Sequence, residues 1–178
     1  MKTLPDDDAL LLALLNTTPA EGGVVTDELG DHERAAALTA QHGGAGTPGE
    51  VENLRQVRDA LRAVVHGEGD PRELAPFVRS AAKVPSMDAT GGLVWLLQAP
   101  QDDLLAARAV IAWSELEQTH PGRLRSCGNP ECRLFLIDRS HGNRAQWCSM
   151  AVCGNRMKAR RHYHRTREAS DGTAADRA

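Results

Sequence analysis

The sequence predicts a mainly α-helical fold with a small β component, in which a multihelical N-terminal body is followed by a small C-terminal module. Three observations predict this division. Apolar residues recur at helical spacing through residues 1–122, in segments that glycine and proline separate. All four cysteines lie between residues 127 and 153. The charge also changes sign after residue 122: residues 1–122 carry 9 Lys and Arg against 19 Asp and Glu, whereas residues 123–167 carry 11 against 2.

The sequence pattern of the N-terminal part of the body predicts two helices. Asp6-Asp7-Asp8 precedes five leucines between residues 10 and 15, and acidic residues favour a helix N-terminus because the helix macrodipole is positive there. Leucines on most faces of this helix predict that it is buried. Thr26 or Asp31 can cap a second helix, which runs to about Gln41 and ends at a glycine-rich linker.

Two clearer helix starts follow the linker. Thr47-Pro48-Gly49-Glu50 combines a capping residue, proline at the first helical position and a capping-box glutamate, and Asp70-Pro71-Arg72-Glu73 repeats this pattern. The glycines between the two segments predict antiparallel helices with a short connection. In the first helix, Arg55, Arg58 and Arg62 lie off the apolar stripe, so they are predicted to face solvent.

The last part of the body predicts a β-hairpin and a long helix. Residues 83–98 place a turn between two apolar segments, and a lone hairpin is marginal in water, so it should lie against the helices with Trp95 as a core anchor. Asp102-Asp103 then open a helix that is apolar on nearly all sides and ends at Pro121-Gly122. This is the predicted central helix, and the apolar stripes of residues 1–120 are expected to pack together without the C-terminal module.

The four cysteines form two C-x4-C pairs, and each pair can make a tight turn that offers two thiolates. Four thiolates about 2.3 Å from one point make a tetrahedral zinc site. Between the pairs, Leu134–Ile137 is a short β-type segment, and Ala145–Trp147 can return as a second strand. A helix is favoured from about Ser149. This order is that of a treble-clef-like finger, with one structural Zn²⁺ per chain held by Cys127, Cys132, Cys148 and Cys153.

Two disulfide bonds or a redox switch are the alternatives to zinc. Disulfide bonds require an oxidising compartment, and the N-terminus lacks the cationic and long apolar regions of a signal peptide. The longest pure leucine run, Leu10–Leu12, is far too short to span a bilayer. These features favour zinc and predict a cytoplasmic protein with no membrane partner.

The sequence does not predict an enzyme, and no catalytic residue is assigned. Four cysteines fill every position of a tetrahedral zinc ion, whereas a catalytic zinc keeps one position open for water. His162 and His164 follow the cysteines but lie two residues apart, so on a helix their side chains point in different directions. The other histidines match no metalloprotease or serine-hydrolase motif.

The stretch from Leu124 to Arg165 resembles a known family. Cys153-Gly154-Asn155-Arg156, preceded by Trp147-Cys148-Ser149-Met150 and by Leu134-Phe135-Leu136-Ile137-Asp138, is similar to the CGNR zinc-finger family of bacterial stress-induced transcription regulators. That family has a helical N-terminal domain called ABATE, and Leu14-Leu15-Asn16-Thr17 resembles its Asn-Thr motif without the usual aromatic residue. Family members often carry Arg-Arg before Trp-Cys. Here Ala145-Gln146 stand in that place, which removes two candidate phosphate contacts.

The resemblance implies an ABATE-like domain over residues 1–122, a CGNR-type finger over residues 123–167, and a role as a DNA-binding transcription regulator. The residues agree with this role, because a cationic helix held rigid by a metal site presents its charges to phosphates at little further entropy cost. Arg156 can instead brace the zinc loop, since it directly follows the last cysteine pair. The predicted DNA contacts are Arg156, Lys158, Arg160, Arg161 and Arg165.

A zinc-stabilised protein-interaction module is the alternative function. In it, the basic residues of 123–167 face an acidic partner or the acidic body of the same chain. A homodimer or a regulatory protein is a further candidate partner beside DNA. The polar tail of residues 168–178 has nothing to bury and is predicted to be disordered.

Overall fold

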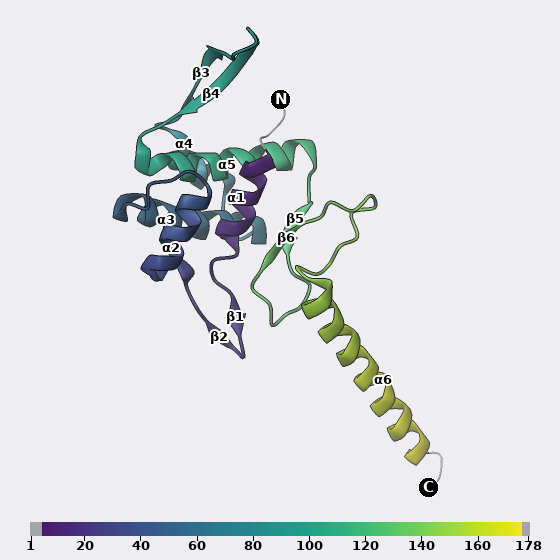
Figure 1. Cartoon of the computed structure of the whole chain (residues 1–178). Helices are drawn as coiled ribbons and strands as arrows, with labels where there is room; N and C mark the ends of the chain where they lie inside the picture. The colour runs from purple at the N-terminus through teal and green to yellow at the C-terminus, as the bar shows by residue number, and fades with distance from the viewer. Residues whose placement is uncertain (1–4, 176–178) are drawn as a thin grey trace.

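The computed structural model describes residues 5–175 of the chain (Figure 1). A helical body that contains α1 to α5 leads into a small module with strands β5 and β6, and the described chain ends in the long helix α6. The predicted fold class, mainly α-helical with a small β component, is confirmed. In the described residues the strands form three antiparallel pairs, which are β1–β2, β3–β4 and β5–β6.

The first two helices begin and end where local signals place them. Helix α1 spans Pro5–Leu15, and α2 spans His32–Gln41. Asp31 caps α2, since its carboxylate accepts hydrogen bonds from the Glu33 and Arg34 amides. The connection between the two helices contains β1 (Ala20–Glu21), β2 (Val24–Val25) and the 3₁₀ turn η1 (Glu28–Gly30).

The later helices of the body follow their predicted starts. Helix α3 spans Pro48–His66, with Thr47 as its N-cap and Gly67 in the left-handed conformation at its end. The second predicted start gives only the 3₁₀ turn η2 (Pro71–Leu74) and the short helix α4 (Ala75–Val78). Helix α5 spans Gln101–Thr119.

Helix α5 is the centre of the body, as the sequence predicts. It packs against α1, α3 and α4. Small side chains on its buried faces let the neighbouring helices approach closely, because the distance between helix axes depends on the residues at the contact. The leucines of α1 supply much of the opposing surface and are fully buried; they are Leu10, Leu11, Leu14 and Leu15.

Arg58 and Arg62 are buried, so the prediction that they face solvent was wrong; they are 4% and 9% exposed. The Arg58 guanidinium pairs with Asp27 at 2.6 Å and donates to Thr17 Oγ1 at 3.2 Å. Burial lowers the pKa of Arg58, but hydrogen bonds to Asp27 and Asp59 outweigh it and raise the pKa above its usual value. The helix pattern alone does not reveal these partners, because most of them come from distant parts of the chain.

The β-hairpin of the C-terminal module is built into the core of the body. Strand β5 (Leu124–Ser126) pairs with β6 (Phe135–Ile137), and Phe135 is 1% exposed within the main hydrophobic cluster. The Asn16 side chain makes two hydrogen bonds to the backbone of Phe135. Its Nδ2 donates to the Phe135 carbonyl at 3.2 Å, and its Oδ1 accepts from the Phe135 amide at 2.7 Å. Residues 1–120 therefore do not complete the core by themselves.

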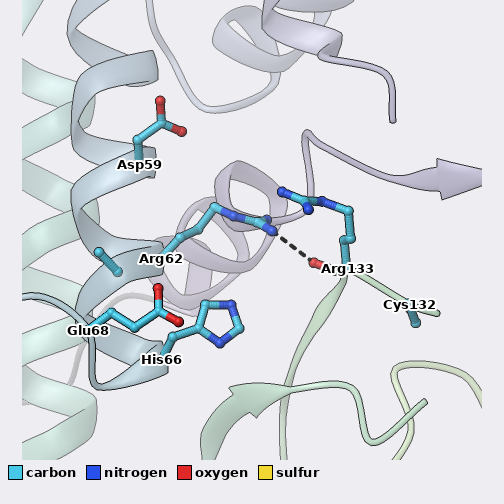
Figure 2. Close-up of a pocket in the computed structure, with 7 residues that line it drawn as sticks. Asp59, Arg62, His66, Glu68, Cys132 and Arg133 are labelled. Carbon is cyan, nitrogen blue, oxygen red and sulfur yellow. Dashed lines mark hydrogen bonds between the residues drawn. The ribbon is translucent and has the colours of Figure 1, made fainter. Parts of the chain in front are cut away.

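Arg62 links the same hairpin to two helices. Its guanidinium donates to the Arg133 carbonyl at 3.2 Å (Figure 2) and to the Leu15 carbonyl at 2.6 Å. It also lies 4.8 Å from the centre of the Phe135 ring. A pocket of about 410 Å³ remains beside this contact and is lined by residues of α3, by Glu68 just after α3, and by residues of the C-terminal module. The His66 ring lies 5.2 Å from the Phe135 ring and covers it from α3.

The predicted hairpin near residues 83–98 forms, but its position differs from the prediction. Strands β3 (Ala82–Met87) and β4 (Leu93–Gln98) project from the body (Figure 1). Trp95, which was predicted to anchor the core, is 55% exposed. The physical reason is that α1, α3 and α4 already cover the apolar sides of α5.

The C-terminal module also differs in two places. The segment predicted as a strand at Ala145–Trp147 is a loop, and β6 pairs instead with β5, so the first cysteine turn lies inside the hairpin. Helix α6 spans Asn155–Ala175 and extends away from the body (Figure 1). Residues 168–175, predicted to be disordered, continue this helix, and residues 176–178 lie outside the described part. No proline interrupts the chain there.

We predict that Asn16→Ala loosens the hairpin from the body. The substitution leaves the buried amide and carbonyl of Phe135 without their partner, which costs about 2–4 kcal/mol of the free energy of unfolding. Urea unfolding followed by helical circular dichroism measures the change. Gln56→Ala, on the exposed side of α3, is the control and should change stability by about 0.5 kcal/mol or less. Equal stability of the two variants would contradict this role for Asn16.

Candidate metal centre and basic surface

The four cysteines meet at one point in the C-terminal module. Cys127 follows β5, Cys132 comes shortly before β6, and Cys148 lies in the loop before η3, a turn of π-helix that spans Met150–Gly154 and contains Cys153. Their four Sγ atoms lie within 4.8 Å of one another. Cys127 and Cys153 are buried, and the other two are half-buried.

The distances within the cluster fit a metal ion. The Sγ atom of Cys148 lies 3.7 Å from that of Cys132 and 3.7 Å from that of Cys153. Two ligands of a tetrahedral zinc ion with Zn–S bonds of about 2.3 Å lie about 3.8 Å apart. A disulfide bond requires about 2.05 Å. The cysteines are free in the structure, and the cluster matches the predicted four-thiolate site instead of two disulfides.

Asn129 supports the cluster from a fully buried position. Its Nδ2 donates to Cys153 Sγ at 3.5 Å, and its own carbonyl accepts from the Cys132 amide at 2.8 Å, so one residue joins both cysteine pairs. Burial alone would raise the pKa of the Cys153 thiol, but hydrogen bonds from Asn129 and the other thiols lower it. Burial and the neighbouring thiols raise the pKa of Cys148. Four crowded thiolates need a cation, and a divalent metal supplies it.

Trp147 packs against a glycine of each cysteine pair. A Cβ atom on Gly128 would lie 3.2 Å from the Trp147 ring, and one on Gly154 would lie 3.1 Å from it. The first glycine also donates its amide to the Gln146 carbonyl at 2.7 Å. A side chain at either position would therefore force the Trp147 indole to shift, and at Gly154 the Met150 side chain as well.

Asp138 organises the loop that was predicted to contain a strand. Its buried carboxylate accepts from the Ser140 amide at 2.7 Å and from the Ala145 amide at 2.8 Å, and it pairs with the Arg125 guanidinium. Hydrogen bonds from Ser140 lower the pKa of this carboxylate most. Side-chain contacts thus replace the expected strand pairing and fix the path of the chain to Trp147.

A basic groove of about 650 Å³ lies between this loop and α6. Arg125, Arg144 and Arg161 contribute cationic side chains, and Trp147 and Met157 contribute apolar surface. No acidic residue lines the groove. Such a surface can accept an anionic, partly flat ligand.

The predicted contact residues of α6 divide into two groups. Arg161 lines the groove, and Lys158, three residues before it, and Arg165, four residues after it, lie on the same side of the helix. Arg160 lies elsewhere and pairs with Glu131 of the finger at 2.9 Å. Arg156 is exposed, and among the described residues it makes no hydrogen bond that braces the zinc loop.

The structure also shows how far the acidic body of the same chain neutralises the basic residues of the finger. Arg139 of the finger pairs with Asp8 of the body at 3.0 Å. In the described part of the chain, however, the cations of α6 make no ion pair with the body. The cations of α6 that are therefore left exposed to solvent are Arg156, Lys158, Arg161 and Arg165.

Sequence reasoning quoted Gly154 only as part of the family motif and assigned no role to Gly128, Asn129 or Arg144. One signal was present: the tripeptide Cys-Gly-Asn occurs twice, at Cys127 and at Cys153. The two copies differ in conformation, because the first follows β5 as an irregular turn and the second lies in η3 and the start of α6. Asn129 also differs from Asn155 in reaching a sulfur atom.

Comparison with known families covers both parts of the chain. Residues 123–166 match the CGNR zinc finger, and residues 8–117, more than half of the chain, match ABATE, described as "Putative stress-induced transcription regulator". No curated protein matches the chain significantly. The clustered cysteines are thus the zinc site of a CGNR zinc finger. Within the described residues, no helix has the length and apolar character needed to cross a membrane.

We predict that Asn129→Ala weakens zinc binding by about 10-fold or more, because residues that orient metal ligands typically contribute this much. Competition with a chromophoric chelator measures the affinity. Asn155→Ala is the matched control, since Asn155 also follows Cys-Gly but donates to the Ala151 carbonyl. Both variants should bind about one zinc per chain at saturation. Equal affinities would contradict the role of Asn129.

Proposed function

The chain belongs to the ABATE family of transcription regulators, and from this premise we propose that it binds DNA through its C-terminal finger. In this proposal one structural zinc ion, held by Cys127, Cys132, Cys148 and Cys153, fixes the start of α6 and directs its cations at the phosphate backbone. With four thiolates the ion has no open position for a substrate, so it does not act as a catalyst.

The basic groove is the observation that carries the proposal. It places Arg144 and Arg161 beside the Trp147 ring, in a hollow without acidic residues. Guanidinium groups bind phosphate oxygens in a bidentate geometry, and aromatic rings pack against sugars or bases. Arg125 also lines the groove, but its guanidinium is already engaged by Asp138, so we assign it a structural part.

Helix α6 extends this surface beyond the groove. Lys158, Arg161 and Arg165 are all exposed and lie on one side of the helix, over about 10 Å of its axis. Arg144 lies one residue before the Ala145-Gln146 pair and restores one of the phosphate contacts whose absence the sequence suggested. Arg156 and Arg160 remain proposed contacts, with the charge of Arg160 partly balanced by Glu131.

The proposed compartment is the cytoplasm. Four free thiols that must stay reduced to bind zinc require a reducing environment.

We predict that binding to random duplex DNA is strongly salt-dependent. If about four or five phosphates are neutralised, log K should fall against log salt with a slope near −4. The variant Lys158→Ala/Arg161→Ala/Arg165→Ala should flatten the slope by about three, because three phosphate contacts are lost. Fluorescence anisotropy over a salt series measures both slopes, and metal analysis verifies that zinc remains bound.

A control variant with the same change in net charge separates the loss of phosphate contacts on α6 from the loss of long-range electrostatic attraction. Arg34→Ala/Arg72→Ala/Arg79→Ala removes three exposed arginines from the body and should leave the slope nearly unchanged. Equal loss in the two triple variants would contradict a binding surface on α6. Zinc-loaded wild-type protein without salt-sensitive DNA binding would favour the protein-interaction module.

A further inference from the structure

The hairpin of β3 and β4, residues 82–98, projects from the body at the opposite end of the molecule from α6 (Figure 1). It exposes large apolar side chains. Met87 pairs with Leu93 and Pro85 pairs with Trp95 on one of its faces. Leu96 and Val94 lie on the other. Met87, Leu93, Trp95 and Leu96 are 64%, 62%, 55% and 50% exposed. A two-stranded hairpin is marginal in water, and further strands stabilise it, so the hairpin is expected to pair with another chain.

The two edges of this hairpin are not equivalent. The Asp88 amide donates to the Gly92 carbonyl at 2.8 Å, which sets the alternation of the antiparallel ladder. By this alternation, the residues paired as 87–93, 85–95 and 83–97 direct their backbone groups outward. On the β3 edge one of these residues is Pro85, which has no amide hydrogen. The β4 edge keeps all three outward backbone amide donors, which belong to Leu93, Trp95 and Leu97.

We propose that β4 pairs with β4 of a second copy of this chain. Antiparallel pairing of two identical strands obeys two-fold symmetry, so the same edge serves both copies. The product is a four-stranded sheet in the order β3–β4–β4–β3. Its outer strands each present Pro85 at the edge, which blocks further addition of strands and limits the assembly to a dimer.

The area and the charge of the hairpin fit a second copy. At about 200 Å² for a fully exposed large side chain, the three exposed residues of β4, Leu93, Trp95 and Leu96, offer about 330 Å² per copy. Two copies offer about 670 Å² at most, to which the backbone edges add, so the interface is small and the dimer is expected to be weak, forming at micromolar concentrations. Residues 82–98 carry only Lys83 and Asp88 as charges, so two copies do not repel each other.

Those two charges already have partners within the chain. Lys83 pairs with Glu115 of α5 at 3.2 Å, and Asp88 accepts hydrogen bonds from the turn that it begins. A partner chosen by charge would find no unused group here. The dimer goes beyond the proposed DNA binding and does not depend on it.

The test is the mass of the zinc-loaded full chain by size-exclusion chromatography with light scattering, from about 5 to 100 μM. We expect twice the chain mass of 19.2 kDa at the upper concentrations. Leu93→Glu/Trp95→Glu should weaken dimerisation at least 100-fold, because it places four like charges in the interface. Both side chains are exposed in one copy, so the helical signal and zinc content should not change.

Val24→Glu/Val25→Glu is the matched control, because it places two glutamates on exposed apolar positions of the β1–β2 hairpin and should leave the dimer intact. Hydrogen exchange adds a readout of the edge: the amides of Leu93, Trp95 and Leu97 should be protected in wild type and exchange rapidly in the glutamate variant. A monomer at all concentrations, a dimer that survives Leu93→Glu/Trp95→Glu, or a dimer with unprotected β4 amides would each overturn the proposal.

Discussion

The contact between Phe135 and the body determines how the rest of the molecule is arranged. The ring is buried among the leucines of the core, and Asn16 holds its backbone by two hydrogen bonds. Only two residues separate Phe135 from Cys132, and the Cys127 amide donates to the Leu134 carbonyl at 2.8 Å. The cysteine cluster and the hydrophobic core are therefore joined through one short hairpin. Part of the free energy of metal binding is expected to stabilise the body as well.

This connection also sets the direction of α6. The hairpin fixes the cysteine cluster on the body, and η3, which contains Cys153, leads directly into α6. Because α6 extends away from the acidic body, its cations remain available to a polyanion. For the proposed binding to DNA, the acidic body has a second effect: it would repel phosphates from the rest of the surface and confine the attraction to the finger. Such a charge division would favour an oriented encounter.

Local signals predicted the helices and the cysteine site well. Asp31 and Thr47 cap helices because capping needs only neighbouring residues, and four cysteines at matched spacing indicate their chemistry directly. The predictions were wrong where contacts with a distant part of the chain determine whether a side chain is buried. Arg58 and Arg62 are buried because the loop after α1 and the finger supply oxygen acceptors, which no helical period reveals. Trp95 is exposed because other helices already cover α5, and this competition for one surface cannot be read from the hairpin itself.

The central claim, that the metal site and the body share one core, is tested most directly by native-state hydrogen exchange with and without a strong zinc chelator. We expect the amides of β5 and β6 to lose protection when zinc is removed. The amides in the last turns of α1 and in the part of α3 that contains Arg58 and Arg62 should lose protection with them, because Phe135 and its hydrogen bonds hold these segments together. Loss of protection confined to residues 123–167, with α1 and α3 unchanged, would contradict the account.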